Sequence, residues 1–170
     1  MTFLNLAKER YSCRQLSDRP VEEEKIEQIL KAGQMAPTAV NKQPYRIFRC
    51  DSEKAKAAIH QVTNCTFGAE TFLIVGGRAE EAWVREFDNK NFVDVDAAIV
   101  ATHMMMAIKD LGLDTTWVGY FDAPKLKDLL PELAPYNLVA IFPVGYAKEE
   151  AKPSDRHEKR RDLSETVITL

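Results

Sequence analysis

Two short clusters in this 170-residue sequence contain side chains that could bind a small molecule. The first cluster reads Arg10-Tyr11-Ser12-Cys13-Arg14. In an extended segment every second residue lies on the same face, so Arg10, Ser12 and Arg14 would point together. Two guanidinium groups and a hydroxyl on one face form a receptor for a phosphate monoester. A solvated basic surface without a ligand can have the same spacing, so the pentapeptide alone leaves both interpretations open.

The second cluster, residues 36–45, reads Ala-Pro-Thr-Ala-Val-Asn-Lys-Gln-Pro-Tyr. Pro37 and Pro44 fix two φ angles and no apolar period runs through the segment, so it is predicted to be a loop. The side-chain amides of Asn41 and Gln43 each offer a hydrogen-bond donor and an acceptor, which would match the mixed edge of a flavin pyrimidine ring. An ordinary connecting loop has the same composition, so this segment also has two interpretations.

Motifs of several other chemistries are missing from the sequence. The three histidines, His60, His103 and His157, are far from one another along the chain, and no histidine–cysteine set has the spacing of a zinc site. There is no Gly-x-Ser-x-Gly, P-loop or Gly-x-Gly-x-x-Gly, so hydrolase, NTPase and Rossmann interpretations lack their usual marks. An enzyme without its own nucleophile or metal usually takes its chemistry from a cofactor.

The composition is that of one ordinary globular domain covering residues 1–170. Apolar residues make up 45% of the chain and charged residues 29%, which is typical of proteins with a hydrophobic core. The net charge of −3 does not favour binding to nucleic acid or to an anionic membrane surface. Cys13, Cys50 and Cys65 are odd in number and widely spaced, and no apolar run predicts a signal peptide. Reduced thiols and a cytoplasmic location are therefore expected.

Apolar periodicity and capping residues predict five helices and four strands. The expected helices cover residues 2–9, 21–35, 52–62, 93–111 and 122–130, and the expected strands cover residues 46–50, 71–75, 115–118 and 138–144. Because these elements are mixed without strict alternation, the predicted class is α+β. Helix 93–111 is apolar on nearly every side, which is typical of a helix buried in a core or a subunit interface. His103 on this helix is expected to be a hydrogen-bonded core histidine.

Two further segments carry predictions. Residues 148–161 are predicted to form a polar arm, followed by a β-prone tip at residues 166–170 that could add a strand to a neighbouring subunit. Trp83 and Phe87 precede the long helix, where they could form either a lid over a pocket or an exposed amphipathic turn.

Taken in order, these motifs resemble the nitroreductase family. Members of that family usually carry Arg-x-Ser-x-Arg and, after the next helix, Ala-Pro-Ser-x-x-Asn-x-Gln-Pro-Trp; this chain has Thr38 and Tyr45 in place of the serine and the tryptophan. Residues 93–98 resemble the start of the family's central helix. Residues 111–122 resemble its Gly-Leu-Gly-x-x-Trp-x-Gly-x-Phe-Asp segment, and residues 144–146 with the basic arm resemble its C-terminal end. The resemblance covers nearly the whole chain.

The resemblance implies a fold and an activity. The fold would be a mixed β-sheet flanked by helices, with a long central helix at a homodimer interface and a swapped C-terminal arm. The activity would be that of an FMN-dependent oxidoreductase: NADH or NADPH delivers hydride to flavin N5, the nicotinamide leaves, and a small-molecule acceptor such as a nitroaromatic or quinone takes the electrons. The flavin would carry the chemistry, so no side chain is expected to act as an acid or a base.

The resemblance also implies which residues hold FMN. Those expected at the phosphate and ribityl chain belong to the N-terminal segment: Arg10, Tyr11, Ser12 and Arg14. The basic arm would complete the phosphate site through Arg160 and Arg161, with Lys159 as a further candidate, although a solvated tail has the same composition. Those expected to cover the isoalloxazine come from the partner's loop: Pro37, Thr38, Ala39, Asn41 and Gln43. Gly119 and Tyr120 would lie beside flavin N5.

Departures from the family pattern leave alternatives open. Some larger members place a glutamate near flavin N5, whereas this chain has Gly119 there, so a backbone N–H would have to polarise N5. The chain is short for the family, and the helical insertions that roof the pocket in larger members are expected to be absent or reduced. A reduced pocket also fits a second interpretation, a protein that binds or sequesters flavin without physiological turnover. The sequence neither names the acceptor nor separates NADH from NADPH.

Overall fold

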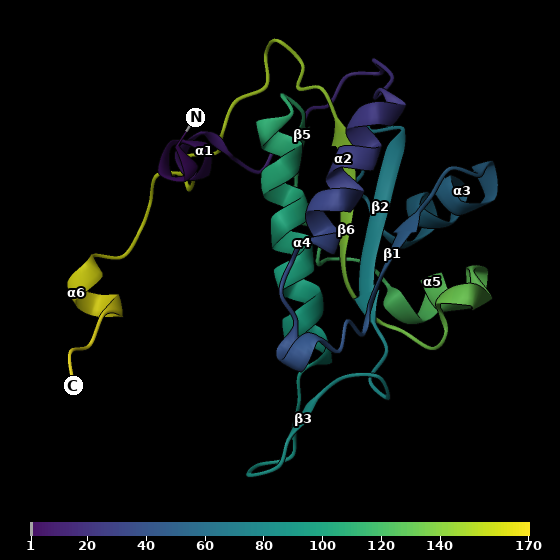
Figure 1. The fold of residues 1–170 in the computed structure, drawn as a ribbon. Helices are drawn as coiled ribbons and strands as arrows, with labels where there is room; N and C mark the ends of the chain where they lie inside the picture. Colours follow the sequence, from purple (N-terminus) through teal and green to yellow (C-terminus); the bar gives the residue numbers. More distant parts are fainter. Residues whose placement is uncertain (1) are drawn as a thin grey trace.

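A computed structural model describes residues 2–170 and contains a four-stranded sheet between two layers of helices (Figure 1). The strands in spatial order are β1 (Tyr45–Arg49), β2 (Thr71–Gly77), β6 (Asn137–Gly145) and β5 (Asp114–Thr115). Each neighbouring pair is antiparallel. The central strands β2 and β6 are buried over most of their length, which is why both read as continuous apolar runs.

Six α-helices are present in residues 2–170. They are α1 (Phe3–Glu9), α2 (Glu23–Gln34), α3 (Glu53–Val62), α4 (Val93–Asp110), α5 (Ala123–Leu129) and α6 (Leu163–Thr166). Three of them begin at predicted capping residues, because the side chains of Thr2, Ser52 and Asp122 accept hydrogen bonds from N–H groups of the first turn. Helix α4 ends before Gly112, whose φ of 73° lies in the left-handed region that glycine adopts without steric cost.

Successive residues of β2 pack into two different layers of the core. Leu73 and Val75 lie in the layer that the sheet forms with α2 and α4. Phe72 and Ile74 lie in the opposite layer, formed with α3 and α5. This division follows from the two-residue period of a strand, and it fixes the sheet between the two helical layers.

Helix α4 has one buried face and one open face. Its buried residues include Ala97, Val100, Ala101, Met104 and Ile108. The opposite face forms an open groove of about 410 Å³, lined by Val95, Ala98, Ile99, Thr102 and His103. The predicted burial of His103 is therefore wrong for the single chain: the residue is exposed, and its Nδ1 lies 2.9 Å from the carbonyl oxygen one turn earlier. No helix in residues 2–170, α4 included, is long and apolar enough to cross a membrane.

The segment between β2 and α4 forms a hairpin that the sequence did not predict. Its strands are β3 (Val84–Arg85) and β4 (Lys90–Asn91). Trp83 packs edge-on against Phe92 with ring centroids 5.0 Å apart, and Arg85 pairs with Asp88 across the turn. Phe87 at the tip is 97% exposed, so within the single chain this segment is an exposed turn.

Two other short elements also differ from the prediction. The strand expected at residues 115–118 is shorter, because β5 ends at Thr115 and Val118 makes only an isolated bridge to Ile141. Single 3₁₀ turns, η1 (Ala39–Asn41) and η2 (Pro131–Leu133), lie in proline-containing connections.

The C-terminal arm leaves the body of the molecule. Figure 1 shows it passing α1 and ending in α6, away from the sheet. Asp162 caps α6 by accepting a hydrogen bond from the Ser164 N–H at 2.9 Å. Thr166, expected in the β-prone tip, is instead the last residue of this helix, and residues 167–170 form no strand within the single chain. A strand added to a neighbouring subunit stays a prediction. A strand needs a neighbour to pair with, so β propensity alone does not form one.

The three cysteines are all free thiols in the structure, as predicted. Cys13 and Cys50 are buried, and Cys65 is half-buried. Burial, with a smaller contribution from the Asp51 carboxylate, raises the pKa of the Cys50 thiol to about 12. Cys50 therefore behaves as a small apolar residue of the core and not as a nucleophile.

Candidate functional site

The N-terminal motif lies in an extended segment beside the edge strand β5. Ser12 forms a parallel bridge with Thr115, and the Cys13 N–H donates to the Thr115 carbonyl oxygen at 3.0 Å. Cys13 is fully buried, whereas Arg10 and Ser12 are half-buried and Arg14 is exposed. Tyr11 is half-buried as well, so burial separates only Cys13 from the rest of the motif, and Arg10, Ser12 and Arg14 are all accessible to solvent.

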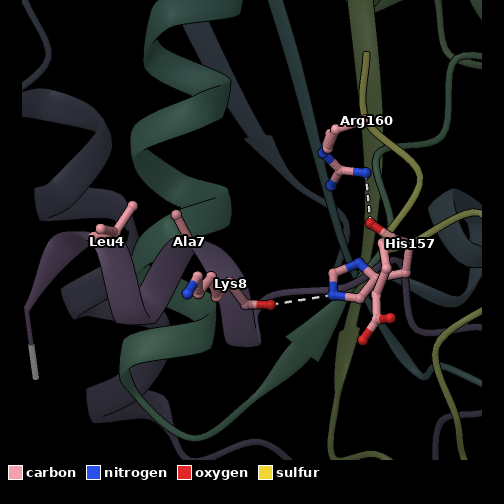
Figure 2. Close-up of a pocket in the computed structure, with 6 residues that line it drawn as sticks. Leu4, Ala7, Lys8, His157 and Arg160 are labelled. Atoms are coloured by element: carbon pink, nitrogen blue, oxygen red, sulfur yellow. Dashed lines mark hydrogen bonds between the residues drawn. The ribbon is translucent and has the colours of Figure 1, made fainter. Parts of the chain in front are cut away.

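The C-terminal arm folds back against α1 and closes one side of a cavity near this motif (Figure 2). His157 Nε2 lies 3.1 Å from the Lys8 carbonyl oxygen, and the ring of His157 meets that of Tyr11 edge-on. The cavity has a volume of about 510 Å³ and is lined by Leu4, Ala7, Lys8, His157, Glu158 and Arg160. Of the three predicted arm cations, only Arg160 is among the residues that line this cavity. Its chain neighbours Lys159 and Arg161 are exposed and do not line the cavity.

Arg160 lies in the wall of this cavity, and Arg10 lies close enough to Arg160 for the two positive charges to interact. Partial burial and, second, the positive charge of Arg160 lower the pKa of Arg10. The Arg160 guanidinium is held in place because its Nη1 donates to the Lys159 carbonyl oxygen at 2.9 Å and to that of His157. An anion between two such guanidinium groups would remove their repulsion. Glu158 in the wall offsets part of the positive charge that Lys8 and Arg160 bring to the cavity.

Tyr11 connects the N-terminal motif to the C-terminal end of α4. Lys109 Nζ lies 5.6 Å from the centroid of the Tyr11 ring and pairs with Asp114 Oδ1 at 3.0 Å. Burial, followed by the neighbouring Cys13 thiol and the Asp114 carboxylate, raises the pKa of Tyr11. The phenol therefore stays protonated at neutral pH and can donate a hydrogen bond.

Gly119 and Tyr120 follow the segment that pairs with the N-terminal motif. Apart from its chain neighbours, a Cβ at Gly119 would meet no atom of residues 2–170 within 4 Å, so the backbone here is open to a flat ring. The Tyr120 carbonyl accepts a hydrogen bond from Thr63 Oγ1 at 2.7 Å, which fixes this backbone, while the Tyr120 residue is 84% exposed. A second cavity, of about 330 Å³, is lined by Val62 and residues 119–122.

The proline-containing loop lies at the N-terminal end of α4. The Ala39 N–H donates to Asp96 Oδ1 at 2.8 Å, and the Gln43 N–H donates to Thr38 Oγ1 at 3.0 Å. Gln43 Nε2 also donates to Asn41 Oδ1 at 3.1 Å, so the two predicted amides bind each other. Asn41 Nδ2 and Gln43 Oε1 remain as a donor and an acceptor for a ligand.

One chain does not bring all the predicted residues together. The arginine cluster and Tyr11 lie near Lys109, at the C-terminal end of α4, whereas the loop that begins at exposed Pro37 is held by Asp96 near the N-terminal end (Figure 1). Asp96 and Lys109 are 13 residues apart on this helix, which corresponds to about 20 Å. The cluster and the loop are thus two separate surfaces of the same chain.

Sequence reasoning missed three residues of these surfaces: Lys8, His157 and Asp96. The contact between Lys8 and His157 joins positions 149 residues apart, and no local pattern predicts it. Asp96 did carry a signal, because it is a carboxylate placed among the apolar residues of a buried helix face. Such residues are almost never fully buried unless they have a partner.

The chain is similar to proteins of one family. The family model described as Nitroreductase family matches residues 7–68 and 64–146. The chain belongs to this family. A crystal structure of a nitroreductase family protein from Clostridium difficile 630 has a TM-score of 0.91 and 35% identity, and the match covers 100% of both chains. The predicted nitroreductase family and the predicted α+β fold with helices flanking the sheet are therefore confirmed.

Three similar proteins illustrate the range of similarity. An Archaeoglobus fulgidus protein provisionally named NADH dehydrogenase/NAD(P)H nitroreductase is 30% identical over 151 residues, which are 83% of each chain. A Staphylococcus aureus NADPH-dependent oxidoreductase is 26% identical over 168 residues, and this chain spans 64% of its length. An Exiguobacterium sibiricum protein, provisionally described as a nitroreductase, has been solved in complex with FMN. It shares the fold with a TM-score of 0.83 at 19% identity, and the match covers 100% of this chain and 98% of that one.

Proposed function

We propose that this nitroreductase-family protein is an FMN-dependent oxidoreductase that passes electrons from NADH or NADPH to a nitroaromatic, a quinone or a similar small acceptor. The observation that carries the proposal is the position of Arg160, which lines a cavity and lies close enough to Arg10 for their charges to interact. The motif that contains Arg10 pairs with the segment that leads to the open backbone of Gly119. The names of the Archaeoglobus fulgidus and Staphylococcus aureus relatives support the donor. The FMN-bound Exiguobacterium sibiricum structure supports the cofactor.

The donor set fits the phosphate of FMN. A phosphate monoester carries about −1.5 to −2 charges near neutral pH and has three acceptor oxygens. Arg10 and Arg160 would take two of these oxygens through their guanidinium groups, and the Ser12 hydroxyl and the exposed Arg14 would complete the shell. A dinucleotide such as FAD has no terminal monoester, so this cluster favours FMN over FAD.

The backbone near Gly119 would meet the isoalloxazine ring. When bound, FMN would supply the redox chemistry by taking a hydride equivalent from the reduced nicotinamide and giving electrons to the acceptor. The chain would contribute the Gly119–Tyr120 backbone beside flavin N5, with no side chain at Gly119 to keep the ring away. The Thr63 hydrogen bond to the Tyr120 carbonyl would hold this backbone in place.

We further propose a homodimer with two shared FMN sites. The open apolar groove of α4 gives a second copy a surface to cover, and the C-terminal arm carries exposed Leu163, Val167 and Ile168 away from its own chain. The distance along α4 between the arginine cluster and the loop fits a site built from two chains. The loop residues expected over the partner's flavin ring are Pro37, Thr38, Ala39, Asn41 and Gln43.

Flavin binding followed by turnover tests the proposal. Purified protein saturated with FMN should remain yellow after gel filtration and should release FMN, and not FAD, on denaturation. Loss of the flavin on filtration would overturn the proposal. Oxidation of NADH and NADPH should then be followed with a quinone and with a nitroaromatic. Stoichiometric FMN without oxidation of either nicotinamide would instead indicate a flavin-sequestering protein.

A further inference from the structure

The proline-containing loop has an unusual backbone. Val40, Asn41 and Gln43 have φ angles of 44°, 56° and 50°, in the left-handed region that favours glycine. Asparagine tolerates this region, but a β-branched residue such as Val40 crowds its own backbone there. Residues held in this way persist only when the surrounding structure fixes them, and they concentrate at ligand-binding sites.

Asp96 is the side chain that fixes the start of this turn. Its Oδ1 accepts a hydrogen bond at 2.8 Å from the N–H of Ala39, the residue directly before Val40. Asp96 is only 1% exposed, so water does not compete strongly for this bond. The far end of the loop is tied separately, because the Arg78 N–H donates to the Pro44 carbonyl oxygen at 2.9 Å.

Fold stability does not account for a carboxylate at this position. Asp96 Oδ2 is buried and has no hydrogen-bond partner within residues 2–170. A buried carboxylate with one oxygen unsatisfied destabilises a fold. Asp94, two residues earlier in the same first turn, is by contrast exposed, and its Oδ1 accepts from Asn137 Nδ2 at 3.3 Å. Both carboxylates interact favourably with the N-terminus of the helix, but only Asp96 holds the loop.

We propose that Asp96 is a positioning residue for flavin binding. Through the Ala39 N–H it keeps Val40 and Asn41 in the left-handed turn, and so holds the loop in the shape that meets the flavin of the partner subunit. The inference rests on the proposed function, which places this loop over the partner's isoalloxazine ring. Asp96 itself would not touch the flavin.

Three variants of the homodimer test this role by FMN titration. Asp96→Ala removes the acceptor and should weaken FMN binding about tenfold. Asp96→Asn keeps an oxygen for the Ala39 N–H and should bind FMN within a few-fold of the wild type. Asp94→Ala removes the same charge from the same helix turn without touching the loop, and should bind FMN as the wild type does. Equal affinity in Asp96→Ala and Asp94→Ala would overturn the proposal.

A rescue experiment separates positioning from a structural role. Glycine adopts the left-handed conformation without crowding, so Val40→Gly should restore most of the FMN affinity of Asp96→Ala while changing the wild type little. A cavity or a lost core contact at position 96 would not respond to residue 40. If Asp96→Ala fails to fold and Val40→Gly does not recover it, the role of Asp96 is structural and the proposal is wrong.

Amide hydrogen exchange gives a measurement that does not depend on flavin. The Ala39 amide should exchange slowly in the wild type and in Asp94→Ala, and faster in Asp96→Ala. Slow exchange in all three proteins would contradict the role of Asp96, whatever the flavin titrations show. If the wild type binds no FMN but Ala39 still depends on Asp96, the proposed function fails while the hold on the loop stands.

Discussion

Replacing Arg160 by alanine should have opposite effects on FMN affinity and on the stability of the flavin-free protein. In the proposed site Arg10 and Arg160 both donate to the phosphate, and a hydrogen bond to a charged group contributes about 1.5–3 kcal/mol. Loss of either arginine should therefore weaken FMN binding by about 10- to 150-fold. Without FMN the same two positive charges repel, which together with the larger effect of burial lowers the pKa of Arg10. Arg160→Ala should remove this repulsion.

The stabilisation of the flavin-free protein by Arg160→Ala should be small. Arg160 is exposed, so solvent and salt screen its interaction with Arg10, and a few tenths of a kcal/mol is the expected size. Thermal melts at low and high ionic strength should show the Tm of Arg160→Ala slightly above the wild type at low salt and equal to it at high salt. A Tm clearly below the wild type would mean that Arg160 stabilises the flavin-free arm, contrary to this reasoning.

Isothermal titration with FMN measures the other half of the prediction. The matched control is Arg156→Ala, which removes an exposed arginine from the same arm outside the cavity wall. Arg10→Ala and Arg160→Ala should each lose affinity, whereas Arg156→Ala should not. Wild-type affinity in both Arg10→Ala and Arg160→Ala, or an equal loss in Arg156→Ala, would refute a phosphate site at this cavity.

Three further predictions follow from other features. Deleting residues 159–170 should weaken dimerisation and FMN binding together, as measured by analytical ultracentrifugation and flavin content, and a full-length monomer with stoichiometric FMN would contradict the shared site. Gly119→Ala should leave the free energy of unfolding unchanged or raise it by about 0.4–1 kcal/mol, because the new Cβ enters open space. The same Cβ should weaken FMN binding, and unchanged FMN affinity would mean that the flavin ring lies elsewhere. The hydrogen bond from Tyr146, with smaller effects of a backbone hydrogen bond, Arg19 and Lys25, lowers the pKa of Glu22 from 4.5 to about 2. The stability that these interactions contribute is therefore present above pH 4.5 and is lost as the pH falls towards 2. Tyr146→Phe should reduce this acid-side loss of Tm, and identical pH profiles of the two proteins would show that the bond contributes nothing.

Elements with local signals could be predicted from the sequence. Ser52 and Asp122 mark helix starts by their own capping chemistry, and β2 reads as an apolar run because both of its faces are covered. The β3–β4 hairpin has strands of two residues each, and its contacts include the packing of Trp83 on Phe92 and the Arg85–Asp88 ion pair, which the apolar pattern of the sequence does not reveal. Residues 167–170 form no strand within the single chain because β-branched residues form a strand only beside another strand, and their pairing with a neighbouring subunit stays a prediction.

In the candidate site, too, local sequence patterns predict some features, whereas long-range contacts set the others. The period of an extended chain predicts a shared face for Arg10, Ser12 and Arg14, and all three are accessible to solvent in the structure. Which arm cation lies near Arg10 depends on how the C-terminal arm folds back onto α1. The contact between His157 and Lys8 that fixes this fold joins positions 149 residues apart in the sequence. The hold of Asp96 on Ala39 joins positions 57 residues apart. Contacts of this kind are set by tertiary packing, and single-sequence patterns do not contain them.

The separation of the arginine cluster and the loop at opposite ends of α4 has a consequence for mixtures of variants. In the proposed dimer each flavin site takes its arginines from one chain and its loop from the other. A heterodimer of an Arg10→Ala chain and an Asp96→Ala chain would therefore contain one site with both defects and one with neither. Mixing the two impaired proteins under conditions of subunit exchange should restore tight FMN binding to half the sites of each heterodimer. Oligomerisation and flavin occupancy would also be linked, so that dilution releases FMN and FMN holds the two chains together.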